Sequence, residues 1–376
     1  IINTNTQAKY SLISADDQNY LYECAGLLKN NCGLGVCACS ISLFTSPLLF
    51  RMRSLISSGS SGGSGWDRGE AGAEAGALMT SMASLSKGFV RGGVDGESGD
   101  AFRMALQAAV QVLGIMGEEE QARGGGMVLA HRMVALLGDE VTAWAGGVVG
   151  PLVRNCERDV VEVVQLMNQL LIRFGGRMAS CMEKAVLPFM VRCEKLAPVD
   201  GSREQVEAEA RGLHKIQILF LQHLVSNGCG GVLFSKDVAP GLEGILDLVA
   251  RGMEIKEGAR SCVIFMRKLC EEVGGGGAGE GVEGAFWDFV FNRSLVHLWR
   301  AMMGKGFSAK DAQCLRTLAE GARLMVVVRE RRTERFMGFV DALSGFVGDI
   351  KGREVNRMKG ANEGEFKDII KRALMQ

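Results

Sequence analysis

Stretches of helical length follow one another along most of this chain. From residue 77 onward, apolar residues recur at helical spacing in segment after segment, as at 99–116, 159–174 and 203–227. Turns marked by Gly or Asp separate the segments, and pairs of segments recur about every 35–50 residues. The chain has only 5 Pro, and so few prolines permit long helices. The sequence therefore predicts an all-α protein, an α-solenoid of HEAT- or armadillo-like helical pairs.

A compact helical bundle is the alternative all-α fold. It is less natural here, because a single core rarely serves so many consecutive helices.

The predicted array covers 77–376, and two segments precede it. Residues 1–56 are expected to be an N-terminal helical segment, in which 29–50 has no clear period and is doubtful. A retained intron or a misjoined gene model is one hypothesis for that stretch. Residues 57–76, SSGSSGGSGWDRGEAGAEAG, are rich in Gly and Ser. Such a composition predicts a flexible linker.

The charge of the chain is balanced overall but not along its length. There are 43 basic and 43 acidic residues, so the net charge is zero. From Arg300 to Gln376 there are 16 Lys or Arg against 10 Asp or Glu, which leaves 27 against 33 before it. A nucleic acid would therefore have to be held by a local patch, because no whole-molecule basic field exists.

The eleven cysteines are scattered through apolar helical patterns. Buried reduced cysteine behaves as a small hydrophobic residue, so this usage indicates a reducing, intracellular compartment. The one dense cluster, Cys32, Cys37 and Cys39, does not match zinc-ligand spacing and has no histidine nearby. We expect no metal and no cofactor. The uncharged run at 30–50 contains Ser, Thr and Pro47, which dilute its hydrophobicity, so we expect no membrane span.

No catalytic constellation stands out. The four histidines do not sit with Cys or Ser and an acid in a nucleophile signature. His214 and His223 lie nine residues apart, which is not the spacing of a helical metal pair. The glycine runs at 124–126 and 274–277 lack the Gly-Lys-Ser/Thr ending of a phosphate loop. We therefore expect that the chain is not an enzyme.

The basic run RLMVVVRERRTERF near the C-terminal end is the best RNA candidate in the sequence. Arg329, Arg332 and Arg335 recur at about one turn, which predicts that they line one helix face. A guanidinium group suits phosphate because it gives paired hydrogen bonds. The alternative is a solvated face, in which Glu330 and Glu334 pair with the arginines.

Three collinear stretches resemble the exportin-T family. They are DDQNYLYECAGLL at 16–28, SMASLSKGF at 81–89, and HRMVALLGDEV at 131–141 followed by DVVEVVQLMNQLLIRF at 159–174. The order and spacing of these stretches fit the family. The resemblance runs from about Ala15 to Val347 and weakens after Leu196.

That resemblance implies a karyopherin that exports tRNA from the nucleus together with GTP-bound Ran and releases it in the cytoplasm. It implies a shuttling protein that also contacts nuclear pore proteins. Ran would bind mainly through an N-terminal region of the family that lies outside this sequence. The resemblance makes Lys87 and Arg91 phosphate candidates as well, although cations at a helix end also complement the helix dipole. A HEAT-repeat scaffold that binds only proteins is the alternative function.

Overall fold

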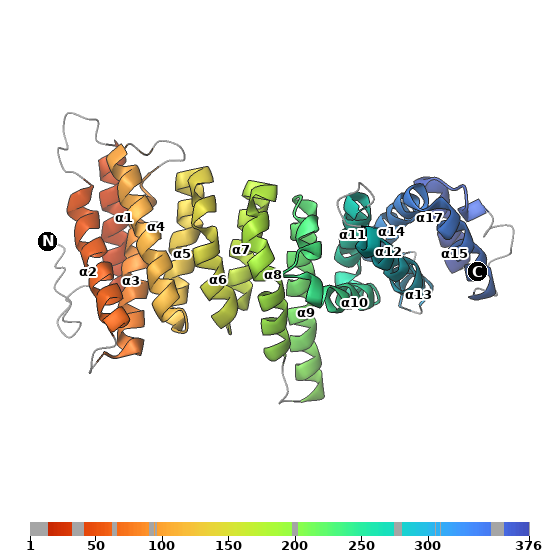
Figure 1. Ribbon diagram of the computed structural model, residues 1–376, viewed down its shortest axis with the longest axis horizontal. Helices are drawn as coiled ribbons and strands as arrows, with labels where there is room; N and C mark the ends of the chain where they lie inside the picture. Colours follow the sequence, from red (N-terminus) through yellow and green to blue (C-terminus); the bar gives the residue numbers. More distant parts are fainter. Residues whose placement is uncertain are drawn as a thin grey trace. The chain divides into compact units, whose positions relative to one another are not determined.

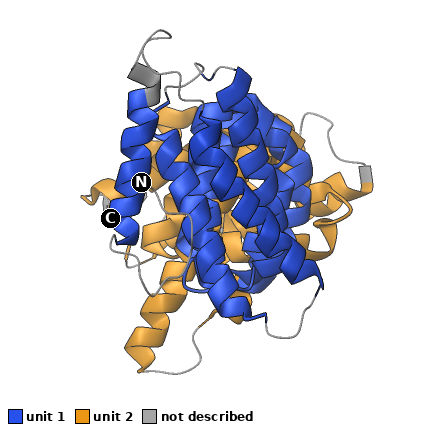
Figure 2. Ribbon diagram, turned by 90° about the vertical axis from the view of Figure 1, so that its left-hand side faces the viewer, with its two compact units in different colours: residues 1–192 blue, residues 193–376 orange. Residues whose placement is uncertain are grey.

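The computed structural model describes residues 14–31, 41–61, 66–89, 94, 96–197, 202–273, 280–304, 306–308, 310–346 and 357–375. Within these ranges nearly every residue is helical and no residue is in a strand. The chain divides into two compact units, Ile1–Arg192 and Cys193–Gln376 (Figure 2). None of the helices in the described ranges is long and apolar enough to cross a membrane.

The first unit packs its helices in two layers (Figure 1). One layer stacks α1 (Ala15–Asn31), α3 (Arg68–Ser86), α5 (Glu120–Leu137) and α7 (Val160–Phe174) in chain order. The other stacks α2 (Ser42–Ser61), α4 (Gly96–Met116) and α6 (Ala145–Asn155). Short 3-10 turns at Gly138–Ala143 and Gly175–Met178 follow α5 and α7. The last helix, α8 (Ala179–Lys195), begins in this unit and ends within the residues of the second unit.

The second unit repeats this plan. One layer stacks α9 (Arg203–Ser226), α11 (Lys256–Val273), α14 (Ala312–Arg331) and α17 (Glu363–Met375). The other contains α10 (Leu242–Gly252), the run of α12 (Glu280–Phe289), a π-helical turn η5 (Val290–Ser294) and α13 (Leu295–Met303), and then α15 (Thr333–Phe346). The 3-10 turns Gly230–Phe234 and Ala239–Gly241 lie between α9 and α10. Helix pairs in two layers confirm the predicted all-α solenoid fold.

The core is built mainly from aliphatic residues, methionine and cysteine. On α4, for example, Phe102, Leu106, Ala109 and Leu113 recur at helical spacing and are at most 1% exposed. Seven of the described cysteines are buried, at 156, 181, 193, 229, 262, 270 and 314. Burial raises the pKa of the Cys262 thiol to about 12, so this side chain packs as a neutral apolar group.

The linker prediction for 57–76 is wrong over the residues that the structure describes. Residues 57–61 end α2, and 68–76 form the first half of α3, while 62–65 lie outside the described residues. Asp67 caps α3, because its carboxylate accepts hydrogen bonds from the backbone N–H groups of Gly69 at 2.9 Å and Glu70 at 3.2 Å.

Gly76, within this segment, serves helix packing rather than flexibility. A Cβ atom on Gly76 of α3 would collide with the carbonyl oxygen of Gln121 in α5, and one on Gly125 would collide with the carbonyl oxygen of Gly76. Only glycine permits this close approach of two backbones. A glycine in a stretch whose composition is typical of a linker therefore allows the close contact between two neighbouring helices of one layer.

The doubtful stretch 29–50 is partly an ordinary piece of the solenoid. Its residues 42–50 begin α2, where Leu48 and Leu49 are buried with Met52 one turn later. Residues 32–40 lie outside the described residues. The origin of the stretch stays a hypothesis, and one continuous array over 77–376 stays a prediction.

Candidate nucleic-acid interface

Lys87 lies where α1 and α3 cross. It is the C-cap residue of α3, and its Nζ is 2.8 Å from Oε2 of Glu23 in α1. The backbones meet beside it, since a Cβ on Gly88 would collide with Gly26. Half of the Lys87 side chain remains exposed, and Arg91 lies outside the described residues.

The three arginines of the C-terminal basic run do not share one helix face. The α14 helix ends at Arg331, and Arg332 has φ −144° and ψ 60°, so helical spacing is broken between Arg329 and Arg332. Arg329 turns toward the segment before α17 and donates to the carbonyl oxygen of Ala361 at 2.6 Å. The predicted single face is therefore wrong.

Arg332 and Arg335 instead hold the start of α15 against α12 and η5. Arg332 pairs with Glu283, and its guanidinium carbon lies 5.2 Å from the centre of the Trp287 ring. Arg335 is 2.7 Å from Asp288 and 4.9 Å from the centre of the Phe291 ring. Ion pairs and ring contacts of this kind stabilise packing between the helices. The partners come from other helices, not from the neighbouring Glu330 and Glu334.

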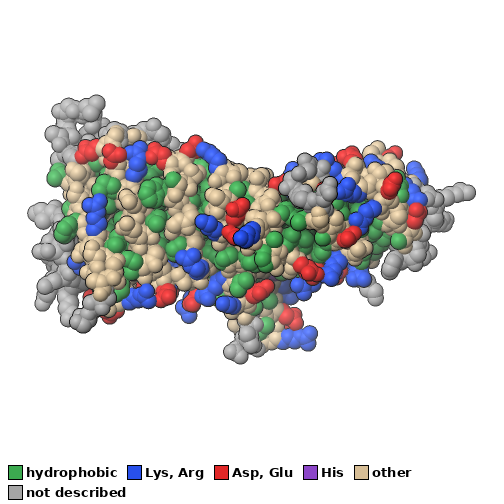
Figure 3. All heavy atoms as spheres, viewed as in Figure 1, with side chains coloured by type: hydrophobic (Ala, Val, Ile, Leu, Met, Phe, Trp, Pro, Cys, Tyr) green, Lys and Arg blue, Asp and Glu red, His purple; other side chains and the backbone are tan. Residues whose placement is uncertain are grey.

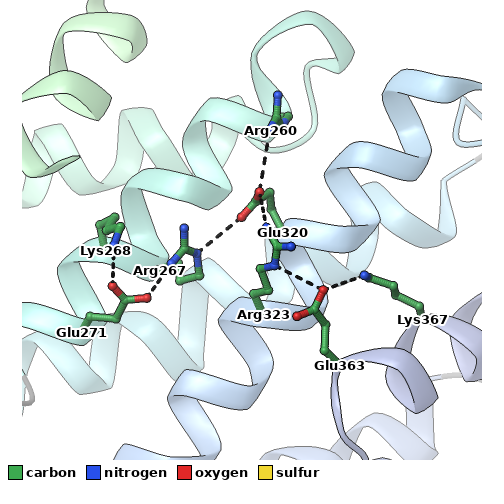
Figure 4. A network of polar contacts seen from close by, with 8 residues as sticks. All are labelled: Arg260, Arg267, Lys268, Glu271, Glu320, Arg323, Glu363 and Lys367. Atoms are coloured by element: carbon green, nitrogen blue, oxygen red, sulfur yellow. Dashed lines mark hydrogen bonds and ion pairs between the residues drawn. The ribbon is translucent and has the colours of Figure 1, made fainter.

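A larger group of charges crosses α11, α14 and α17, and we call it the charged ladder (Figure 4). Its members are Arg260, Arg267, Lys268 and Glu271 of α11, Glu320 and Arg323 of α14, and Glu363 and Lys367 of α17. This ladder was not predicted from the sequence. It contains five cations and three carboxylates, a local surplus of two positive charges.

Glu320 is the centre of the ladder. Its side chain is only 6% exposed, and its carboxylate lies 3.0 Å from Arg323, 3.4 Å from Arg267 and 3.8 Å from Arg260. A buried carboxylate is tolerated when cations surround it in this way. Glu320 thereby fixes the positions of three guanidinium groups that come from two different helices.

The ends of the ladder extend along α11 and α17. Glu271 lies 2.5 Å from Arg267 and 2.9 Å from Lys268. Burial raises the pKa of Glu271, but the hydrogen bonds from Lys268 and Arg267 outweigh it and hold that pKa below its usual value. On α17, Glu363 lies 2.6 Å from Lys367 and 3.2 Å from Arg323. The hydrogen bond from Lys367 is the largest cause that lowers the pKa of Glu363.

The surface elsewhere mixes both signs of charge. On the face drawn in Figure 3, Lys and Arg side chains lie beside Asp and Glu side chains. This agrees with the zero net charge of the chain. Among the described residues, no three His, Cys, Asp or Glu side chains come together to hold a metal ion.

The family model of exportin-T matches residues 3–375 of this chain. The chain belongs to the exportin-T family. Among curated proteins, exportin-T of Pongo abelii and exportin-T of Homo sapiens are each 25% identical over 233 residues, which cover 60% of this chain and 24% of the relative. Exportin-T of Phaeosphaeria nodorum is 21% identical over 293 residues, 72% of this chain and 28% of the relative. The chain thus spans about a quarter of the length of these relatives.

In this exportin-T family chain, three cations of the ladder reach solvent, and the carboxylate at its centre is covered. Arg260, Lys268 and Arg323 are 49%, 38% and 46% exposed, whereas Glu320 is covered. Guanidinium groups held in place lose little freedom when they bind a phosphate. The arrangement can therefore bind an anion of a polynucleotide backbone, although the three carboxylates weaken its field.

Part of this ladder could have been seen in the sequence. Arg260 and Arg267 are seven residues apart on α11, and Glu320 and Arg323 are three apart on α14, so each pair shares a helix face. The sequence gives no sign that these two faces adjoin, because more than forty residues and a second helical layer separate them along the chain.

Proposed function

We propose that this chain is part of a nuclear export receptor for tRNA, and that the charged ladder contacts the phosphate backbone of the tRNA. The observation that carries the proposal is the exportin-T family match over residues 3–375. The name of that family denotes transport receptors, which is why we expect no enzyme activity. The surplus of cations on α11, α14 and α17 supports the proposed location of the contact with the tRNA backbone.

The chemistry of the ladder suits recognition by backbone and shape. Structured RNA presents phosphates and 2′-hydroxyl groups, and its base edges are largely out of reach in the helical parts. Arg260, Lys268 and Arg323 are exposed enough to meet phosphates, and the chain has few aromatic residues for base stacking. Binding would be dominated by release of counterions and would weaken steeply as salt rises.

In the whole protein we propose that tRNA and GTP-bound Ran bind cooperatively. Each ligand would favour the same curvature of the solenoid, so each would raise the affinity for the other. Release of tRNA would follow GTP hydrolysis in the cytoplasm, and the receptor would shuttle through the pore by contacts with nuclear pore proteins. Ran would bind mainly through a region outside this sequence.

The residues predicted from the sequence remain proposed RNA contacts, but they are weaker candidates than the cations of the charged ladder. Lys87 would have to share its charge with Glu23, and Arg335 would have to leave Asp288. The exposed cations of the ladder also pair with carboxylates, Lys268 with Glu271 and Arg323 with Glu320 and Glu363, but the ladder as a whole keeps a surplus of two positive charges.

A filter-binding titration of labelled tRNA against this chain tests the proposal. Salt is raised from about 50 to about 200 mM, and the slope of log affinity against log salt is recorded. The double variant Arg260→Glu/Lys268→Glu should lower that slope by roughly 2, because two phosphate contacts are lost. The matched control is Arg300→Glu, an exposed arginine on α13 in the other layer, which should leave the slope unchanged.

Two results would contradict this assignment. An unchanged slope in the double variant would remove the ladder from the tRNA surface. The absence of any tRNA retention at low salt would favour the alternative, a HEAT-repeat scaffold that binds only proteins, which the inward pairing of Arg332 and Arg335 already fits.

A further inference from the structure

An apolar pocket lies within the second unit, between α15 and the run of η5 and α13. Its volume is about 410 Å³. One wall carries Asn292, Val296 and Trp299, which recur at one helical turn, and the other carries Phe339 and Leu343. Residues at this spacing share a helix face, so two largely apolar stripes, one of them with Asn292 at its end, face each other across the pocket.

The floor of the pocket is closed while its walls remain accessible. Phe291 and Trp299 are each only 6% exposed, and the Phe291 and Phe339 rings lie 6.2 Å apart. Val296 and Phe339 are half-buried. The π-helical turn Val290–Ser294 at one wall carries an extra residue per turn, a device that often marks functional sites.

Two arginines border this apolar space. Arg335 lines the pocket, stacks 4.9 Å from the centre of the Phe291 ring and pairs with Asp288 at 2.7 Å. Arg300 also lines it, in the last turn of α13, and is exposed. Within the described part of the chain, no hydrogen bond or ion pair engages the Arg300 guanidinium. The rim therefore has an uncompensated positive charge beside a deep apolar floor.

We propose that this pocket binds a short peptide segment of a partner protein, in which one bulky apolar side chain is flanked by acidic residues. A pocket of this size takes one large side chain and part of its neighbours. The apolar side chain would lie on Phe291 and Trp299, and a flanking carboxylate would pair with Arg300. RNA fits less well, because a base would have to leave its own stack to reach the apolar floor, and that unstacking costs free energy.

Fluorescence anisotropy on the full chain tests this proposal with three labelled peptides. The first has a Phe-Leu pair between aspartates, the second has lysines in place of the aspartates, and the third has alanines in place of Phe-Leu. Only the first should bind. Arg300→Glu should weaken its binding by about fivefold through lost pairing and new repulsion. Val296→Trp, which fills the pocket from its half-buried wall, should weaken it by more than about tenfold.

The control is Arg154→Glu, an exposed arginine of α6 in the other unit, which should bind the first peptide as the unchanged chain does. Equal binding of the acidic and basic peptides, or unchanged binding in both pocket variants, would overturn the proposal. Binding of a fatty acid such as decanoate without any peptide binding would also overturn it. Arg300→Glu should leave tRNA retention intact, so failure here is separable from failure of the tRNA proposal.

Discussion

Loss of the Arg123 guanidinium should be one of the most damaging single changes in the first unit. The Arg123 side chain is 3% exposed and pairs with Asp159, 11% exposed, at 2.7 Å. It also donates to the carbonyl oxygens of Gly117 at 3.2 Å and Glu118 at 2.8 Å. Arg123 therefore connects the first turn of α5 to two turns. One is the turn before α5, and the other is the turn before α7.

Arg123→Met keeps most of the aliphatic stem and removes every one of these hydrogen bonds. Asp159 would keep backbone amides as partners, such as that of Glu157 at 2.8 Å, but would lose its charged partner. Breaking a buried pair by removing one partner costs about 3–5 kcal/mol. We expect a loss of about 4 kcal/mol in the free energy of unfolding of this unit, a large share of a typical total of about 5–15 kcal/mol.

The pH dependence of this loss has a definite sign. Burial raises the pKa of Asp159, but the hydrogen bonds from Arg123 and the Glu157 amide outweigh it, so the pKa lies below its usual value. In the unchanged chain this contribution is present above the unfolded pKa, about 3.9, and is lost as pH falls through the folded pKa. In Arg123→Met burial remains without the pairing, so the pKa of Asp159 rises and protonation relieves the penalty. The difference in free energy of unfolding between the unchanged chain and Arg123→Met should therefore become smaller as pH falls from neutrality.

Urea unfolding followed by circular dichroism, with amide exchange across α5 and α7, measures both effects on the full chain. The double variant Arg123→Met/Asp159→Asn should lose less than the single variant, because no buried charge is left unpaired. Arg103→Met, at an exposed arginine that pairs with Glu140 at 2.5 Å, is the control and should change little. A loss below about 1 kcal/mol in Arg123→Met, or a gap that does not narrow in acid, would refute the reasoning.

Two further predictions concern packing. Gly125→Val should lower the free energy of unfolding by about 2–3 kcal/mol in a thermal melt, since its side chain would collide with the backbone of α3. Gly124→Ala, on the same helix, meets open space and should raise that free energy by about 0.5–1 kcal/mol. Equal effects of the two changes would contradict the close α3–α5 contact. Burial raises the pKa of Cys262 to about 12, so its thiol should resist alkylation at mildly alkaline pH until the unit unfolds. The half-buried Cys24 should react first. Early alkylation of Cys262, detected by mass spectrometry, would count against its burial.

The helical repeats could be predicted because their signal is local. A segment such as α7 carries its own apolar face, and neighbouring segments repeat it. The first half of α3 could not be predicted, since Gly72 and Gly76 weaken a helix in isolation. Their small size is explained by Glu119 and by α5, which lie almost fifty residues further along the chain. Local propensity and tertiary contact conflict there, and the contact prevails.

The candidate site was predicted less well, for a related reason. Helical spacing placed Arg332 and Arg335 near each other, but their partners Glu283 and Asp288 lie 49 and 47 residues earlier in the chain. The break between α14 and α15 at Arg332 has no proline or glycine to mark it. The ladder around Glu320 was missed because it exists only once three helices are side by side.

The contact between Gly76 and Gly125 sets more than the distance between two helices. It is a point at which the α3 and α5 backbones touch, so a side chain added there would force α5 to shift or tilt, and α7 in turn lies on α5. In a stack, an angular change at one step acts as a lever, because each later helix inherits the rotation of the step before it. A single methyl group at this crossing would therefore displace α7 further than it displaces α5. These two glycines therefore affect the position of every helix stacked after them in the layer.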